Sequence, residues 1–170
     1  MGVRDHATIL RDVAALSLYE DLLAPGETLE LPAGGRILYV ASGEVAGLHA
    51  GRAAFGAEEA TIAAGADGAT VLRWELTDWS TDDAKLTAPV DLDPWADYAM
   101  RCEVDGGAAD GPGIGCVLRG ELTVDGEVVQ PFGAFVEPAE LSGRGSFVRV
   151  VLVRADAPAG KALAQGTLHL

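Results

Sequence analysis

The feature of this sequence that most constrains its fold is an internal repeat, in which residues 34–75 match residues 111–152 without a gap. Gly43-Glu44-Val45 is matched by Gly120-Glu121-Leu122, and Gly56 and Gly133 then follow these triplets at equal spacing. The same register pairs Gly34 with Gly111, Ile37 with Ile114, Val40 with Val117, Gly68 with Gly145 and Val71 with Val148. Because turn glycines and apolar positions recur in one register, the sequence predicts a duplicated structural unit.

Each half is predicted to consist of β-strands. Residues 27–31 alternate polar and apolar side chains, and residues 147–153 are β-branched enough for the interior of a sheet. Asp125-Gly126 between two apolar runs is typical of a hairpin. Helix signals are weak, and residues 11–23 fit a short helix or a pair of strands. With 22 glycines and 8 prolines to form turns, the chain is expected to be all-β.

A segment rich in Asp, Thr and Pro, residues 81–94, is predicted to link the two halves. It divides the chain into an N-terminal repeat over residues 1–80 and a C-terminal repeat over residues 95–170, which ends in an arm. A length of 170 residues suits one medium domain or two small, closely packed ones.

The charge of the chain argues against several classes of partner. The net charge is −14, from 26 acidic and 12 basic side chains, so nucleic-acid phosphates and anionic membranes are repelled. No apolar run approaches the roughly 20 residues that span a bilayer. The N-terminus does not resemble a secretory signal, and two cysteines make no metal framework. We therefore expect a cytoplasmic protein with reduced thiols.

Two segments of the second half carry a family resemblance. Cys116-Val117-Leu118-Arg119-Gly120-Glu121-Leu122-Thr123-Val124-Asp125-Gly126-Glu127 resembles the end of the first cupin motif, and Gly133-Ala134-Phe135-Val136-Glu137-Pro138-Ala139-Glu140 resembles the start of the second. The resemblance extends from about residue 22 to about residue 155 and lies in the pattern of strands and turns. It implies a double-stranded β-helix (jelly roll) present twice, as in a bicupin. We expect a homodimer.

The positions that match the family's metal ligands hold other residues. Counting back from Gly43, the glutamate of the first motif falls on Arg36 and its histidines on Leu29 and Leu31. In the second half these positions are Gly113, Gly106 and Ala108, and the histidine of the second motif falls near Gly68 in the first half and near Gly143 or Gly145 in the second. A divalent metal needs three or four N, O or S donors at roughly 2 Å. We therefore expect no metal, no cofactor and none of the metal-dependent dioxygenase or isomerase chemistry that the resemblance implies.

Four residues are candidates for binding a ligand. Arg36, if it points into the barrel, would need a carboxylate or phosphate partner; alternatively it pairs with a surface acid beside the Gly34-Gly35 turn. Trp74 would form an aromatic wall for a polar ligand, or it fills the core.

Cys102 and Asp110 are the other two candidates. Cys102 shares one face of an expected strand with Met100 and Val104, and the alternative to a reactive thiol is an inert buried one. Asp110 lies in the Gly-rich segment 105–113, where it would serve as a general acid or base, or simply belong to a flexible loop at the barrel mouth.

Three functions remain open from the sequence. The first is a metal-independent cupin-like protein that binds a small metabolite, anionic metabolites included, in one barrel. The second is a metal-independent enzyme of the lyase, epimerase or cyclase type that uses acid–base side chains. The third is a non-catalytic structural or regulatory module.

Overall fold

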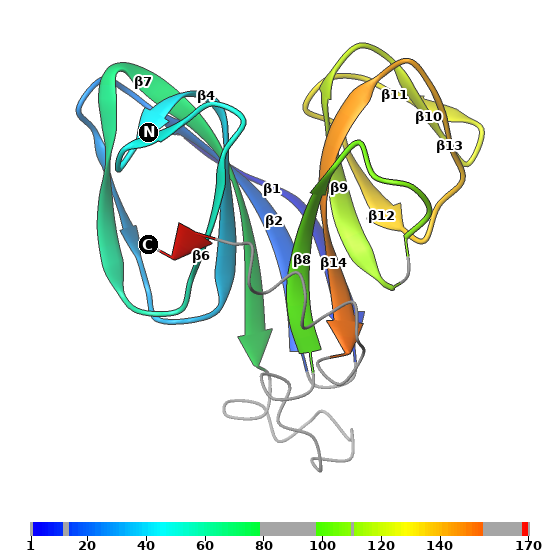
Figure 1. The fold of residues 1–170 in the computed structure, drawn as a ribbon, viewed down its shortest axis with the longest axis horizontal. Helices are drawn as coiled ribbons and strands as arrows, with labels where there is room; N and C mark the ends of the chain where they lie inside the picture. The colour runs from blue at the N-terminus through cyan, green and yellow to red at the C-terminus, as the bar shows by residue number, and fades with distance from the viewer. Residues whose placement is uncertain (1, 12–13, 79–97, 110, 155–167, 170) are drawn as a thin grey trace. The chain divides into compact units, whose positions relative to one another are not determined.

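A computed structural model of the chain describes residues 2–11, 14–78, 98–109, 111–154 and 168–169. The elements in these ranges are all β-strands (Figure 1), as expected from the sequence. They are β1 (Gly2–Arg11), β2 (Ala14–Leu23), β3 (Thr28–Leu31), β4 (Arg36–Val45), β5 (Leu48–His49), β6 (Ala53–Gly56), β7 (Ala60–Asp78), β8 (Tyr98–Val104), β9 (Gly113–Arg119), β10 (Leu122–Val124), β11 (Glu127–Val129), β12 (Ala134–Glu137), β13 (Leu141–Gly143), β14 (Ser146–Arg154) and β15 (Leu168–His169). No helix in these ranges has the length and apolarity to cross a bilayer.

The described residues divide into two compact units. The first contains residues 2–6, 17–77 and 168–169, and the second contains residues 7–11, 14–16, 78, 98–109 and 111–154. The segment 11–23 fitted either a helix or two strands; of its described residues, Arg11 ends β1 and residues 14–23 form β2. The linker predicted at residues 81–94 lies outside the described residues.

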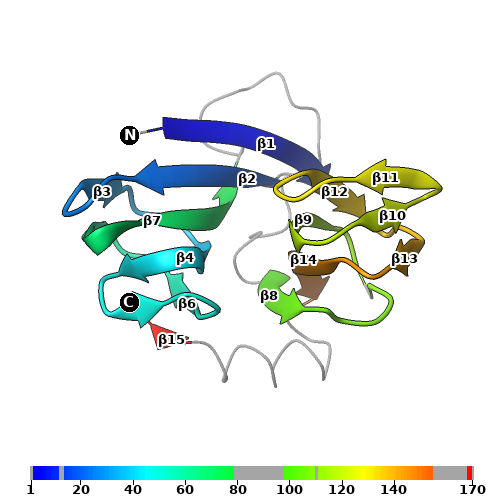
Figure 2. The ribbon, with the colours of Figure 1, turned by 90° about the horizontal axis from the view of Figure 1, so that it is seen from above.

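The two units share one order of strands. In the first unit, neighbouring strands follow the order β2-β7-β4-β6, with β1 beyond β2 and β15 beyond β6 (Figure 2). In the second unit the order is β8-β14-β9-β12, and β11-β10-β13 forms a further sheet. The long strand β7 also pairs through its first residues with β3. A four-stranded pattern with the same connectivity therefore occurs twice.

The pairing registers of the two patterns agree, and both patterns contain a β-bulge. In the first unit the β4–β7 register shifts between Val40 and Ser42, and in the second the β9–β14 register shifts between Ser146 and Phe147. The bulges fall at the same place, because Val40 pairs with Val71 as Val117 pairs with Phe147. This pairing corrects the ungapped repeat: Val40 still matches Val117, but Val71 matches Phe147 and not Val148. A shift of one residue turns a strand's side chains to the opposite face, so the correction changes which residues of β7 and β14 correspond.

An apolar cluster fills much of the interior of each unit. In the first unit it comprises Leu23, Leu29, Leu31, Leu38, Val40, Val45, Leu48, Ala54, Ile62, Ala64, Ala69 and Val71. In the second unit it comprises Val117, Leu122, Val124, Phe135 and Phe147. Alternate side chains of the same strands, such as Leu72, Trp74 and Val150, point to the opposite face and are also fully buried. Burial on both faces explains the near-continuous apolar runs in β7 and β14.

Candidate functional site

The interior of the first unit becomes polar along β4 and β7. Arg36 precedes Leu38 and Val40 along β4 at a spacing of two residues, and Arg73 and Glu75 follow Val71 along β7 at the same spacing. Arg36 pairs with Glu75, and Leu38 pairs with Arg73, across the two strands. Since strand side chains alternate between faces, these charged groups point to the same side as the apolar cluster. We call Asp21, Arg36, Arg73 and Glu75 the first polar cluster.

Arg73 is the centre of this cluster. Its Nε donates a hydrogen bond to Asp21 Oδ2 at 2.7 Å, and its Nη2 donates to Asp21 Oδ1 at 3.1 Å. Its Nη1 donates to Glu75 Oε1, and its guanidinium carbon lies 4.6 Å from the centre of the Tyr19 ring. Burial alone would lower the pKa of Arg73, but the hydrogen bonds and charges of Asp21 and Glu75 raise it above its ordinary value. Arg73 therefore stays charged and is held by a two-pronged pair with a buried carboxylate.

Arg36 lies inside the unit and is only 2% exposed. Its Nη1 donates hydrogen bonds to Pro32 O at 2.8 Å and to Gly34 O at 3.3 Å, and its Nη2 donates to Glu58 O. Its partners are thus backbone carbonyls and not the surface acid that was one alternative. Burial lowers the pKa of Arg36. Its Nε–H is buried and has no hydrogen-bond acceptor among the described residues.

Gly56 gives the guanidinium of Arg36 its space. These two residues pair across β4 and β6, and a Cβ built on Gly56 would lie 3.3 Å from Arg36 Nη2 and 3.4 Å from its Nε. Any larger residue at position 56 would press on the guanidinium. Gly56 therefore lacks a side chain because the Arg36 guanidinium needs the space, and not because a turn requires a glycine.

The second unit contains a matching arrangement. With the corrected register of β7 and β14, Arg73 corresponds to Arg149. Arg149 donates to Glu103 Oε2 from Nε at 2.9 Å and from Nη2 at 2.7 Å, and to Glu137 Oε1 from Nη1 at 2.6 Å. Arg101 Nε lies 2.7 Å from the other oxygen of Glu103. We call Arg101, Glu103, Glu137 and Arg149 the second polar cluster.

Two members of the second polar cluster are almost inaccessible to solvent. The side chains of Arg149 and Glu137 are 1% and 0% exposed. Glu137 Oε2 also accepts a hydrogen bond from the backbone N–H of Ala139 at 2.7 Å. Although burial favours a lower value, the hydrogen bonds and charges of Glu103 and Glu137 raise the pKa of Arg149. In each unit, two arginines and two carboxylates thus balance their charges.

The positions that match the cupin metal ligands do not fit a metal. Leu29 and Leu31 belong to the apolar cluster, and Arg36 brings a cation where the family motif has a carboxylate. Within the part of the chain that the structure describes, no three His, Cys, Asp or Glu side chains gather closely enough to hold an ion. A mechanism that uses a metal therefore has no support from these residues.

The other candidates from the sequence do not gather around Arg36. Trp74 is fully buried and pairs with Ile37, so it lies on the face of the sheet opposite Arg36. Cys102 pairs with Val150, and burial followed by the charge of Glu103 raises the pKa of its thiol to about 12. Asp110 lies outside the described residues. A ligand-binding role for these residues stays a prediction.

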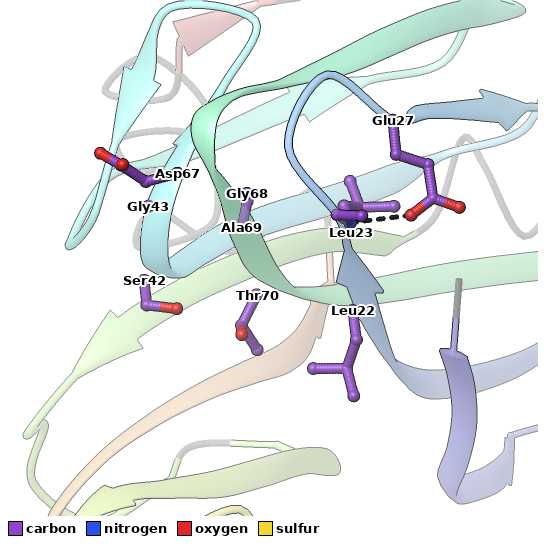
Figure 3. A pocket seen from close by; sticks show the side chains of 10 residues that line it. Leu22, Leu23, Glu27, Ser42, Gly43, Asp67, Gly68, Ala69 and Thr70 are labelled. Carbon is purple, nitrogen blue, oxygen red and sulfur yellow. Dashed lines mark hydrogen bonds between the residues drawn. The ribbon is translucent and has the colours of Figure 1, made fainter.

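The first unit has a larger and a smaller hollow among its described residues. The larger is a surface groove of about 480 Å³ across β2, β4 and β7 (Figure 3), lined by Leu22, Leu23, Ala24, Glu27, Ser42, Gly43, Asp67, Gly68, Ala69 and Thr70. The smaller, of about 50 Å³, is lined by residues 32–35, Glu75 and Leu76. The smaller hollow lies beside the first polar cluster, because its lining includes Glu75, which is the cross-strand partner of Arg36, and Gly35, which precedes Arg36 in the chain.

Backbone segments approach each other closely at the groove. A Cβ on Gly43 would lie 2.0 Å from Gly68 O, and one on Gly68 would lie 2.6 Å from Leu23 O. Both glycines have positive φ angles, 75° and 77°. At the rim, Glu27 Oε2 accepts a hydrogen bond from Ala24 N at 2.7 Å, as drawn in Figure 3. In the second unit, Gly120 and Gly145 approach each other in the same way, so the glycines mark a close crossing of strands in both units.

Sequence reasoning missed six members of the two polar clusters, namely Asp21, Arg73, Arg101, Glu103, Glu137 and Arg149. The available signal was a charged residue inside an apolar run, as in Val71-Leu72-Arg73-Trp74 and Val148-Arg149-Val150. Such a residue is almost never fully buried unless it is paired, so it predicts a partner elsewhere in the fold. The one-residue error in the repeat hid the correspondence between the two arginines.

Comparison with known proteins supports the fold and leaves the activity open. No family model and no curated protein sequence matches the chain. Among solved structures, YhaK from Escherichia coli has a TM-score of 0.51 at 11% identity, over 89% of this chain and 92% of that one. Protein Ylba from E. coli has a TM-score of 0.50 at 10% identity, over 86% and 81% of the two chains.

A third similar structure is a cupin 2 conserved barrel domain protein from Leptotrichia buccalis, with a TM-score of 0.43 at 17% identity over 89% of each chain. At these identities, the likeness to YhaK and Ylba concerns the fold alone. For the residues that the structure describes, the all-β prediction is confirmed.

Proposed function

We propose that the chain is a metal-independent, bicupin-like member of the cupin superfamily that binds a small polar molecule beside Arg36 in its first barrel. The repeated strand order and the shared β-bulge support two cupin-like units. Leucine and arginine at the metal-ligand positions support a function that does not use a metal.

The observation that carries the proposal is the buried Nε–H of Arg36, which lacks an acceptor within the described part of the chain. A buried donor without a partner costs about 1–3 kcal/mol, and more when it is charged. An oxygen acceptor on a bound molecule would remove this cost. The nearby hollow of about 50 Å³ holds a group of a few heavy atoms; it is lined by residues 32–35, Glu75 and Leu76 and not by Arg36 itself, so a ligand that reaches Arg36 Nε requires the turn at residues 32–35 to move.

Charge narrows the kind of molecule. The first polar cluster contains two arginines and two carboxylates, and Glu75 lines the same hollow. A simple anion would meet the carboxylate of Glu75 as well as Arg36. A neutral molecule with an oxygen acceptor next to a hydroxyl or amide donor satisfies both side chains and is therefore favoured over an anionic metabolite.

Native mass spectrometry of the full chain as purified tests this function. We compare the wild type with Arg36→Met and with Arg52→Met, which removes an exposed arginine of the same unit. A small-molecule adduct that Arg52→Met retains and Arg36→Met loses is the expected result. Gly56→Ala, which crowds the guanidinium without removing it, is expected to weaken the adduct. No adduct in the wild type, or a stoichiometric transition metal by elemental analysis, would contradict the proposal.

A non-catalytic module is the second candidate. The apolar clusters in both interiors and the paired charges beside them favour it, because they tie strands together without offering a free acid or base among the described residues of these clusters. The same experiment separates the two, since a module without a ligand gives no adduct in any variant.

A further inference from the structure

The Gly-rich loop at residues 105–109 of the second unit packs directly on the second polar cluster. Arg149 Nη2 donates a hydrogen bond to Gly107 O. A Cβ built on Gly106 would lie 2.8 Å from Glu103 Oε2 and 3.2 Å from Arg149 Nη2. The backbone of the loop thus approaches the ion pair so closely that a Cβ at position 106 would displace the ends of the Glu103 and Arg149 side chains.

One end of this loop is fixed to the barrel wall. Asp105 Oδ1 accepts a hydrogen bond from Phe147 N at 2.8 Å, and Asp105 Oδ2 accepts one from Ser146 Oγ at 3.0 Å. Asp105 N donates to Phe147 O at 3.0 Å. Beyond this anchor, Gly107 and Ala108 are exposed, and a Cβ on Gly107 would meet none of the described atoms within 4 Å. The loop is therefore anchored through Asp105, and its outer surface is exposed. We call the hydrogen bond from Arg149 to Gly107 O the latch.

In the first unit, too, an arginine contacts the backbone of a turn. There Arg36 donates to the carbonyls of Pro32 and Gly34, in the turn before β4. In the second unit Arg149 donates to a carbonyl in the segment before β9. In both units, an interior arginine thus donates a hydrogen bond to a backbone carbonyl in a connection between strands.

We propose that the 105–109 loop is a lid over the second polar cluster, and that its Gly107 carbonyl occupies on Arg149 the place of a small molecule's oxygen acceptor. When the latch breaks, the loop swings on Asp105 and exposes the Arg149 guanidinium. The ligand that replaces Gly107 O carries a carbonyl oxygen and no net charge, because Glu103 and Glu137 already balance the cations. This inference concerns the second unit and does not depend on the function proposed for Arg36.

Phenylglyoxal, a small dicarbonyl reagent specific for arginine, tests access to Arg149 in the full folded chain. Peptide mass spectrometry follows its labelling beside hydrogen exchange of the loop and of β14. In the wild type we expect Arg149 to be labelled faster than β14 amides exchange, since opening of the lid is a local event. Gly106→Ala is expected to raise the Arg149 labelling rate by on the order of tenfold or more, because crowding disfavours the closed loop.

Gly107→Ala is the matched control, since its Cβ meets open space, and it is expected to label at the wild-type rate. Ser146→Ala removes one bond of the anchor without crowding and gives a milder rise, which keeps the test usable if Gly106→Ala fails to fold. Labelling of Arg149 only at the rate of β14 exchange overturns the lid. So does an equal effect of the alanine substitutions at positions 106 and 107.

Discussion

Asp21→Asn tests whether the interior ion pairs hold the first barrel together. The carboxylate of Asp21 is fully buried and accepts two hydrogen bonds from Arg73, at 2.7 and 3.1 Å. Loss of one partner of a buried pair costs about 3–5 kcal/mol. Because Arg73 keeps its contact with Glu75, we expect the lower end, about 3 kcal/mol, which is a large part of a typical stability of about 5–15 kcal/mol.

Urea unfolding, followed by tryptophan fluorescence, measures this loss at neutral pH. Asp67→Asn is the control, because Asp67 is an exposed aspartate of the same unit; its cost should stay below about 0.5 kcal/mol. The double variant Asp21→Leu with Arg73→Met removes both charges together and should recover most of the lost stability. If Asp21→Asn costs no more than Asp67→Asn, the ion pair does not stabilise the barrel and the reasoning fails.

Two further substitutions and one labelling experiment test the strand crossing, the Cys102 thiol and the turn at the groove. Gly43→Ala should lower the free energy of unfolding in urea by at least about 3 kcal/mol, because φ is 75° and the Cβ would meet a backbone oxygen at 2.0 Å. The control Gly47→Ala, with a φ of 80° and open space around it, should lower it by only about 1–2 kcal/mol. Cys102, with its pKa raised to about 12, should hold a thiolate fraction on the order of 10⁻⁴ at about pH 8, so the folded chain should react with Ellman's reagent at this thiol far more slowly than the chain in denaturant. A hydrogen bond from a backbone N–H lowers the pKa of Glu27 below its ordinary 4.5, so the stability that Glu27 contributes is complete above that pH and is lost as the pH falls through the folded-state pKa. Glu27→Gln should therefore lower the melting temperature at pH 7 but not at about pH 2.

The sequence predicts the architecture better than the site. Recurring glycines and apolar positions are enough to predict two similar all-β halves, because they mark turns and buried faces. They do not reveal that the second half has one residue fewer between its bulged strand and its closing strand. Val71 matches Val148 as well as it matches Phe147 in hydrophobicity, so pattern alone does not choose between the two registers.

The polar clusters are hidden for a different reason. Arg73 and Asp21 lie 52 residues apart in the sequence, and Arg149 and Glu103 lie 46 apart, so no local pattern joins them. Arg36 was found because the cupin motif marks its position. Its actual partners are backbone carbonyls, which carry no sequence signal at all.

A high-resolution crystal structure of the chain as purified tests the central claim most directly. We predict electron density for a small molecule in the first unit, with an oxygen acceptor within about 3.2 Å of Arg36 Nε and no metal at that place. Density for a metal ion coordinated in the barrel, or an interior in which Arg36 Nε meets only water, would contradict it.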